Sequence, residues 1–275
     1  MIHLCSRLPD TRLRPYIKMY FGAADDTPPR VQRILPNGEI GLCFYRGDAV
    51  VYDGIGSVQS CVSGQMMQYQ DILSCGRIDI VGAHLTTIGA HVLLQKPMNE
   101  IGSRTVALSA LNDPELLALE DTIMTADSYE ECFAAMDACF LHRLRGTAVD
   151  MLNVRRILRA IAYGQRHCAE VLIPDIASEA CLSQRHFSRL FTSMVGISPK
   201  EYLRLQRFQS ALRELKSHAD GPALPGNDTL TEIAWRNGYY DYAHLYSDFR
   251  KISGYSPRQL VERSENKDDA YGWRL

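Results

Sequence analysis

A duplicated pattern in the C-terminal half constrains the fold of this 275-residue chain more than any other feature. Residues 182–199 read LSQRHFSRLFTSMVGISP, and residues 241–257 read DYAHLYSDFRKISGYSP. At a shift of 58 residues the equivalent positions include His186 and His244, Phe191 and Phe249, and the Gly-x-Ser-Pro runs at 196–199 and 254–257. An Ile-Ala pair precedes each copy at an offset of 57, which places one extra residue beside Gly238. The pattern predicts one structural unit used twice.

Each copy has the pattern of two helices joined by a short turn. Apolar residues recur at helical spacing, and in the first copy Ser183 precedes them as an N-cap and Gly196 follows as a stop. The apolar stripes are Phe187, Leu190, Phe191 and Met194 in the first copy, and Leu245, Phe249 and Ile252 in the second. A helix with the stripe Val154, Ile157, Leu158 and Ile161 is expected ahead of them. The sequence therefore predicts an all-α region with two helix-turn-helix units.

The polar faces of these helices suit DNA. A major groove accepts one α-helix, and two helices on a rigid connector can enter successive grooves about 34 Å apart. Arg185 and Arg189 lie four residues apart on the exposed face, where either could pair with guanine. Such arginines are often only a solvated surface, but the paired copies favour DNA binding. Phosphate contacts are expected from Ser183, Lys200, Arg204, Arg207, Arg250, Lys251 and Arg258.

Residues 150–262 resemble the DNA-binding domain of the AraC/XylS family. The second-unit signature of that family is matched by Ile233, Ala234, Gly238, Tyr239, Asp241, His244, Phe249, Gly254 and Pro257. The resemblance implies a transcriptional regulator. It also implies base contacts from Arg185, Ser188 and Arg189 in the first unit, and from Tyr242, Ala243, Tyr246 and Ser247 in the second.

The second unit departs from the family pattern at its base-contacting positions. Leu245 replaces a common Phe, which is a tolerable apolar exchange, and Ser247 stands where Arg is common. Asp248 is expected to add a negative charge nearby. Because no long basic side chain remains at these positions, we expect the first unit to provide most of the sequence specificity and the second mainly to contact the DNA backbone.

The charge is divided unevenly along the chain. Residues 148–275 hold 18 Lys and Arg against 15 Asp and Glu, a net charge of +3, whereas the first 147 residues hold 12 against 17, a net charge of −5. This asymmetry suggests two domains with different partners. We expect a domain at 1–146, the DNA-binding domain at 147–265 and a polar tail at 266–275. The lack of an apolar run of about 20 residues and of a signal peptide predicts a cytoplasmic protein.

The N-terminal half has a weaker pattern. Residues 39–45, 50–52 and 78–85 are predicted strands, Asp113-Pro114 is expected to begin one helix, and Ser128 with Glu131 to cap another. On the latter helix, Phe133, Met136 and Phe140 form either a dimer seam or, as we favour, core packing. The family resemblance implies a cupin-like, β-rich sensor domain with helices, giving an α+β chain that is either monomeric or a homodimer. A small-molecule effector, and RNA polymerase if the protein is an activator, are expected only through this resemblance.

Two other functions are compatible with parts of the sequence. An alkyl-transfer DNA-repair enzyme with a helix-turn-helix appendage needs a cysteine cluster, and the eight cysteines are dispersed. The N-terminal half could instead be a protein-interaction module without a ligand. His84 and His91 lack the spacing of a metal site and are interpreted as structural histidines. No enzyme activity, metal or cofactor is therefore expected.

Overall fold

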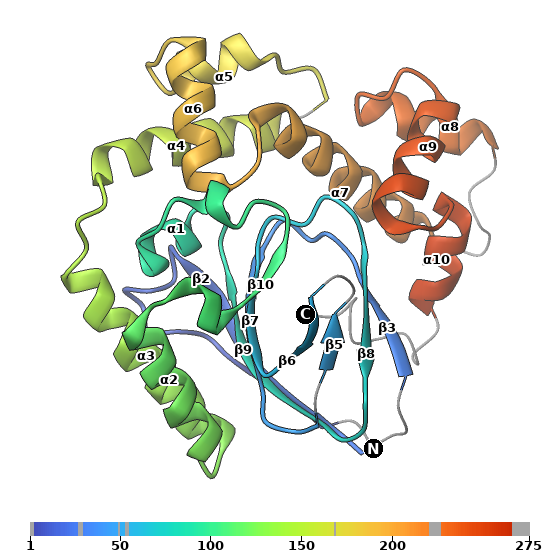
Figure 1. Ribbon diagram of the computed structural model, residues 1–275. Coiled ribbons are helices and arrows are strands. Elements are labelled where there is room, and N and C mark those ends of the chain that lie inside the picture. The colour runs from blue at the N-terminus through green and yellow to red at the C-terminus, as the bar shows by residue number, and fades with distance from the viewer. Residues whose placement is uncertain are drawn as a thin grey trace.

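The structure is a computed structural model that describes residues 3–26, 30–48, 50–52, 55–167, 169–219 and 227–265. A β-rich N-terminal part, β1 to α3, is followed by a helical C-terminal part, α4 to α10, which lies over one end and one side of it (Figure 1). This arrangement confirms the expected α+β fold with a β-rich domain ahead of a helical one. The expected polar tail at 266–275 lies outside the described residues.

The N-terminal part is built from two antiparallel sheets. A six-stranded sheet has the order β1-β2-β9-β4-β7-β10, and a four-stranded sheet has the order β3-β8-β5-β6. The strands are β1 (His3–Arg7), β2 (Ile17–Asp25), β3 (Arg30–Ile34), β4 (Ile40–Tyr45), β5 (Val50–Tyr52), β6 (Gly56–Val58), β7 (Ser60–Ser63), β8 (Gln70–Ser74), β9 (Ile78–Leu85) and β10 (Thr105–Ala107). The three predicted strands are confirmed as β4, β5 and β9, and the others carry no clear alternation in the sequence.

Side-chain alternation along β4 separates two apolar layers. Ile40, Leu42 and Phe44 point to one face of the large sheet and are fully buried against helices. The intervening residues Gly41, Cys43 and Tyr45 face the small sheet and line a cavity between the sheets. This period of two is the ordinary consequence of strand geometry, and it gives the large sheet one face for the core and one for the cavity.

Helices cover the core face of the large sheet. They are α1 (Gly89–Leu94), the 3₁₀ turns η1 (Met98–Glu100) and η2 (Leu108–Leu111), α2 (Pro114–Thr125) and α3 (Tyr129–Arg145). Asp113 caps α2 by accepting from the amide of Leu116, and Ser128 caps α3 by accepting from that of Glu131, as predicted. Phe133, Met136 and Phe140 are buried in the core beneath α3, which confirms core packing for this stripe.

The C-terminal part contains the two predicted helix-turn-helix units. Its helices are α4 (Met151–Arg166), α5 (Ile173–Glu179), α6 (Gln184–Val195), α7 (Pro199–Ala219), α8 (Asn227–Arg236), α9 (Tyr242–Ser253) and α10 (Pro257–Glu265). We call α5 with α6 unit 1, and α8 with α9 unit 2. The stripe of α4 is buried at Val154, Ile157 and Ile161 but not at Leu158, which is 36% exposed because it lies at the border of the contact face. None of the helices in the described ranges is long and apolar enough to cross a membrane.

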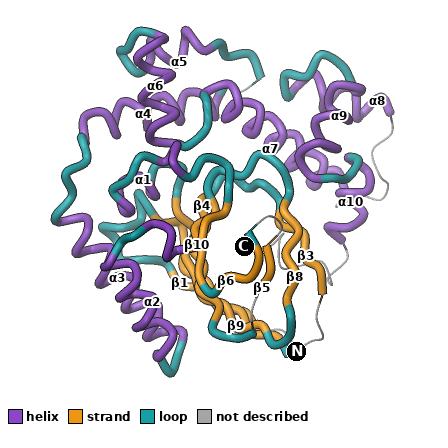
Figure 2. Tube along the Cα trace, in the orientation of Figure 1, coloured by secondary structure: helices purple, strands orange, loops and turns teal. Residues whose placement is uncertain are grey.

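The two parts share apolar cores. Ile88 and Val92 of the N-terminal part pack into the core of unit 1. Leu35, which follows β3, packs into the core of unit 2. Figure 2 shows the helices of unit 1 above the loops at one end of the sheets, and α9 and α10 beside β3 and β8. The β-rich part therefore contacts both units, and it also contacts the connecting helix α7, where Nε2 of Gln209 donates to the carbonyl of Pro36 at 3.5 Å.

Candidate DNA-binding surface and N-terminal cavity

The turns of the two units have the same backbone. Cys181 and Gly238 occupy equivalent positions, with φ of 54° and 74°. In each turn the next residue donates to an alanine carbonyl five residues earlier, Leu182 to Ala177 and Tyr239 to Ala234. The equivalence ends there, because unit 1 continues directly to its N-cap Ser183 whereas unit 2 inserts Tyr240 before Asp241. The extra residue predicted beside Gly238 is therefore Tyr240.

The second helix of each unit is capped in the same way. The side chains of Ser183 and Asp241 accept from the amides of His186 and His244, respectively. Gly196 and Gly254 end the helices in the left-handed region, with φ of 94° and 76°. Such caps satisfy amides and carbonyls that a helix end leaves unpaired, so each helix has fixed boundaries.

The outer face of α6 presents the base-contacting residues expected in unit 1. Arg185 and Arg189 are exposed and Ser188 is half-buried between them. The opposite face of the helix is buried through Phe187, Phe191 and Met194. The helix thus holds two guanidinium groups outward on a rigid base, which suits bidentate contact with guanine.

The outer face of α9 is aromatic instead of basic. Tyr246 and Ala243 are exposed, and Tyr242 and Ser247 are half-buried. The rings of Tyr242 and Tyr246 meet edge to face, with centroids 6.1 Å apart. Phenolic hydroxyls can donate to phosphates or accept from bases, but they do not supply the positive charge that Arg185 and Arg189 supply in unit 1.

Asp248 does not add a charge to this face, and that expectation was wrong. Its side chain is buried, and the guanidinium of Arg204 on α7 donates to it from Nη2 at 2.8 Å and from Nε at 3.0 Å. These hydrogen bonds raise the pKa of Arg204 above its ordinary value. The charge that the sequence suggests for the DNA face is instead used to fasten α9 to α7.

The predicted phosphate contacts divide into two groups. Ser183, Lys200, Arg250, Lys251 and Arg258 are exposed. Arg204 and Arg207 are half-buried and face unit 2 internally, Arg204 through Asp248 and Arg207 by donating from Nη1 to the carbonyl of Gly238 at 3.5 Å. The structure therefore brings the first group to the surface and gives the two α7 arginines partners within the protein.

Exposed aromatic residues beside the turn of unit 2 were not predicted. Trp235 is 62% exposed and Tyr240 is 86% exposed. The indole Nε1 of Trp235 donates to the carbonyl of Tyr240 at 3.1 Å, so both lie at the inserted residue. The insertion itself was visible in the sequence, and it is the signal that could have directed attention to this turn.

The N-terminal part packs against the C-terminal ends of α6 and α9, the second helix of each unit. A Cβ atom added at Gly196 would lie 3.1 Å from the carbonyl oxygen of Met98 and 3.3 Å from that of Gly102. At Gly254 it would meet the guanidinium of Arg33. Both glycines are therefore needed for close approach as well as for their positive φ. The N-terminal ends and outer faces of α6 and α9 stay exposed.

Arg33 makes the main side-chain contact with unit 2. Its guanidinium carbon lies 3.7 Å from the ring centroid of Tyr69 and 4.8 Å from that of Tyr255. Asp71 accepts from Nε and Nη2 at 2.7 Å each, and the pairing lowers the pKa of Asp71. The amide of Tyr69 also donates to the carbonyl of Ile252 on α9 at 2.7 Å. We call these four residues, Arg33, Tyr69, Asp71 and Tyr255, the Arg33 stack.

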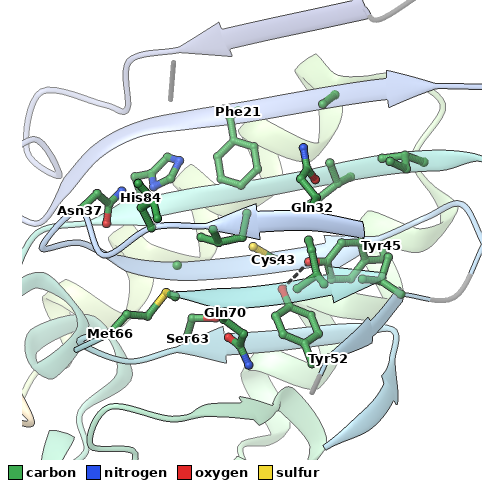
Figure 3. Close-up of a pocket in the computed structure, with 18 of the residues that line it drawn as sticks. Phe21, Gln32, Asn37, Cys43, Tyr45, Tyr52, Ser63, Met66, Gln70 and His84 are labelled. Atoms are coloured by element: carbon green, nitrogen blue, oxygen red, sulfur yellow. Dashed lines mark hydrogen bonds between the residues drawn. The ribbon is translucent and has the colours of Figure 1, made fainter. Parts of the chain in front are cut away.

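A cavity of about 140 Å³ lies between the two sheets. Its wall is mostly apolar, with polar groups at the two ends and with Gln32, Ser63 and Gln70 between them (Figure 3). Asn37 and His84 lie at one end, and the phenols of Tyr45 and Tyr52, which hydrogen-bond to each other, lie at the other. Gln32, Ile34 and Leu35, from β3 and its end, and Gln70 and Ile72, from β8, also line it.

No metal-binding arrangement is found among the described residues, where no three His, Cys, Asp or Glu lie together. His91 Nδ1 pairs with the carbonyl of Lys96 at 2.9 Å, and burial lowers the pKa of this histidine. The cysteines of the described ranges are free thiols, of which Cys75 and Cys181 are exposed. The ligand cluster that the repair-enzyme alternative requires is thus not present in this part of the chain.

Comparison with known proteins places the helix-turn-helix units in a family. Residues 176–263 match the family described as "Helix-turn-helix domain", and residues 6–107 match "Domain of unknown function (DUF6597)". The HTH-type transcriptional activator RhaS of Klebsiella pneumoniae (strain 342) is 30% identical over 109 residues, which are 39% of this chain and 36% of the relative. RhaS of Escherichia fergusonii is 33% identical over 106 residues, 38% of this chain and 35% of the relative. The chain thus spans about a third of the length of these curated relatives.

Solved structures of similar proteins were also found. The structure of ToxT from Vibrio cholerae has 8% identity and a TM-score of 0.44, covering 95% of this chain and 97% of that one. The DNA-binding domain of AdpA, solved in complex with a target DNA, has 25% identity and a TM-score of 0.34, covering 41% and 94%. The sequence matches and the two capped units agree with the resemblance noted above. Residues 176–263 thus form a helix-turn-helix domain of the AraC/XylS family.

Proposed function

We propose that this protein is a transcriptional regulator that binds specific double-stranded DNA by placing α6 and α9 in successive major grooves. The observation that carries the proposal is the pair of equivalent helices with the same caps and exposed outer faces. They are joined through α7, whose 21 residues span about 32 Å at 1.5 Å per residue. That length is close to the roughly 34 Å between successive major grooves.

The base contacts in this proposal come from Arg185, Ser188 and Arg189 of unit 1, and from Tyr242, Ala243, Tyr246 and Ser247 of unit 2. Backbone contacts come from the exposed residues Ser183, Lys200, Arg250, Lys251 and Arg258. Because its base-contacting face holds tyrosines and no arginine, unit 2 contributes less discrimination between bases than unit 1. The relatives described as transcriptional activators support activation, with RNA polymerase as the further partner.

Residues 1–146 would then modulate DNA binding. The division falls between the end of α3 at Arg145 and the start of α4 at Met151. Strands β3 and β8 support this role, because they line the cavity and also bear the Arg33 stack against unit 2. A cytoplasmic location belongs to the same proposal, which is compatible with a monomer or a homodimer.

Selection of bound duplexes from a random DNA pool, with the full chain at physiological salt, tests the function. We expect two enriched blocks about one helical turn apart, one sharp and one degenerate. If no motif is enriched, and if binding declines uniformly with ionic strength as non-specific binding does, the proposal of sequence-specific regulation is wrong. A sharper block under unit 2 would retain the function but overturn the assignment of specificity to unit 1.

A further inference from the structure

We propose that the cavity between the two sheets binds a small, uncharged, mainly apolar molecule that carries one hydroxyl group or a similar hydrogen-bond donor. The inference rests on the proposed function for the consequence of binding, a change in DNA affinity. The binding itself does not depend on the proposed function, because the size, polarity and wall of the cavity support it independently.

The size of the cavity limits the ligand. Its volume of about 140 Å³ is close to that of an engineered apolar cavity of about 150 Å³ that binds benzene. The wall is formed by side chains such as Phe21, Ile34, Ile72 and Ile80. A ligand of this size that is largely apolar would replace empty space by van der Waals contacts without leaving polar groups unpaired.

The polar end of the cavity holds a carboxylate whose charge is already compensated. Oε1 of Glu39 accepts from Nζ of Lys18 at 2.6 Å, and Oε2 accepts from Nδ2 of Asn37 at 3.0 Å. Nδ1 of His84 lies 2.9 Å from the same Oε2 atom. Burial raises the pKa of Glu39, but the hydrogen bonds and charges of His84 and Lys18 together hold it below its ordinary value. An anionic ligand would be repelled by this carboxylate, and a cationic one would find it already paired.

His84 provides the group that a ligand can use. Both ring nitrogens of His84 are buried; Nδ1 lies 2.9 Å from Oε2 of Glu39 without well-aligned hydrogen-bond geometry, and Nε2 has no hydrogen-bond partner among the described residues. With Nδ1–H directed at Glu39, Nε2 accepts in the neutral imidazole and donates in the imidazolium, and a hydroxyl group can pair with it in either state. The ring stands against Phe21, with centroids 4.7 Å apart, which fixes its orientation in the wall (Figure 3). A buried polar atom without a partner is costly, and a ligand hydroxyl, which can donate or accept, would satisfy it.

The opposite end needs nothing from the ligand. The hydroxyls of Tyr45 and Tyr52 hydrogen-bond to each other, and Sγ of Cys61 lies 3.5 Å from the Tyr52 hydroxyl. Burial raises the pKa of both tyrosines, which keeps them neutral. A ligand with one polar group, oriented toward His84, therefore matches the whole cavity better than one with polar groups at both ends.

Occupation of the cavity should change the position of unit 2 more than that of unit 1. Ile34 and Leu35 line the cavity, and Leu35 also packs into the core of unit 2. Two members of the Arg33 stack, Arg33 and Asp71, lie on β3 and β8, and the stack contacts Tyr255 just after α9. A ligand that displaces β3 or β8 would thus shift the position at which α9 is held.

The experiment measures binding to the full chain by titration calorimetry, with phenol, benzyl alcohol and cyclohexanol as probes. Toluene, which lacks the hydroxyl, and benzoate, which is anionic, are the matched comparisons. We expect one saturable site per chain for the hydroxylated probes, with binding of toluene and of benzoate each weaker by about tenfold or more. If no hydroxylated probe binds, or if benzoate binds most tightly, the proposal is wrong.

Two variants locate the site. A Cβ atom at Gly41 would have its nearest neighbours, Sγ of Cys43 and Cβ of Ser63, at 3.9 Å, so a Cβ atom can be added there without a clash. Gly41→Leu should fill the cavity and abolish binding, whereas Gly41→Ala should fold and retain it. His84→Phe should bind phenol and toluene with similar affinity. Thermal unfolding of each variant checks its fold.

The outcomes separate the two proposals. If Gly41→Leu folds and binds phenol as the wild type does, the site lies elsewhere and the cavity assignment is overturned. If phenol binds in the cavity but leaves the DNA affinity of the wild type unchanged, the effector role is overturned and the binding site stands. Selection from the random DNA pool without probe is independent of both results.

Discussion

Unit 1 and unit 2 have equivalent turns, equivalent caps and equivalent buried phenylalanines, Phe191 and Phe249, and they differ in what surrounds this shared backbone. Unit 1 presents two exposed arginines, and its helix end lies against backbone carbonyls of Met98 and Gly102. Unit 2 presents tyrosines, and its helix end is held by the side chains of the Arg33 stack. The duplicated fold thus presents two chemically different outer faces.

Position 190 and its equivalent, position 248, show how the difference arises. In unit 1 the residue is Leu190, which packs at the edge of the core. In unit 2 it is Asp248, buried against Arg204. A leucine needs only apolar neighbours, whereas a buried carboxylate needs a cation, so α9 is tied to α7 by a charge that has no counterpart at this position in α6.

The largest expected effect tests whether the two cores are equivalent. Phe191→Ala and Phe249→Ala each remove a ring that is at most 1% exposed. We expect each to lower the free energy of unfolding by about 3–5 kcal/mol, measured by urea denaturation. A much smaller loss for Phe249→Ala would show that unit 2 is not packed as unit 1 is.

The next effect concerns the tie between α9 and α7. Asp248→Leu introduces the residue type of unit 1 and leaves Arg204 without its partner, so we expect a loss of about 1–3 kcal/mol. The double variant Arg204→Met with Asp248→Leu should recover most of it. A double-mutant cycle by urea denaturation measures the coupling, and simple additivity of the two single changes would contradict the account.

Backbone contacts should be alike in the two units. Lys200 and Arg258 are equivalent, each following a Ser-Pro pair, and both are exposed. Lys200→Ala and Arg258→Ala should each weaken binding to all DNA sequences and reduce the salt slope by about 1. Fluorescence anisotropy at several salt concentrations measures this slope. Loss of sequence preference in either variant would argue for base contact instead.

The smallest effect is confined to unit 2 and depends on pH. The hydrogen bonds of Arg33 lower the pKa of Asp71 in the folded protein, so the pair stabilises the fold above the unfolded value of about 3.9. This contribution is lost as pH falls through the folded pKa. Hydrogen exchange of the Tyr69 amide, which is bonded to Ile252, should therefore speed up in acid beyond its intrinsic trend. In Asp71→Asn the Tyr69 amide should exchange faster already at neutral pH. The amide of Gly196, which donates to the carbonyl of Thr192, should show neither change.

Features that depend on residues close together in the sequence could be predicted, and features that depend on residues far apart could not. The caps at Ser183 and Gly196, and the strands β4 and β9, depend on neighbours within a few residues, and the sequence indicates them. Strand β3 does not alternate clearly, because Arg33 and Gln32 serve a contact with unit 2 and a cavity wall. Local patterns contain no information about either partner.

The same reason explains the errors at the candidate site. Asp248 and Arg204 are 44 residues apart, so the sequence shows two charged residues but not their pairing. The cavity requires β4 and β9 to place Gly41 beside His84, a register that only the folded sheet defines. The outward position of Arg185 and Arg189 on α6, in contrast, follows from helical spacing alone.

The central claim is that unit 1 provides most of the sequence specificity and unit 2 mainly contacts the DNA backbone. Random-pool selection with the wild type, with Arg185→Ala plus Arg189→Ala, and with Tyr242→Phe plus Tyr246→Ala tests it most directly. The account predicts that the arginine variant loses the sharp block, by about 1–3 kcal/mol of discrimination for each arginine contact, while the tyrosine variant retains it. If the arginine variant keeps the sharp block and the tyrosine variant loses it, unit 2 is the specific reader and the account is wrong.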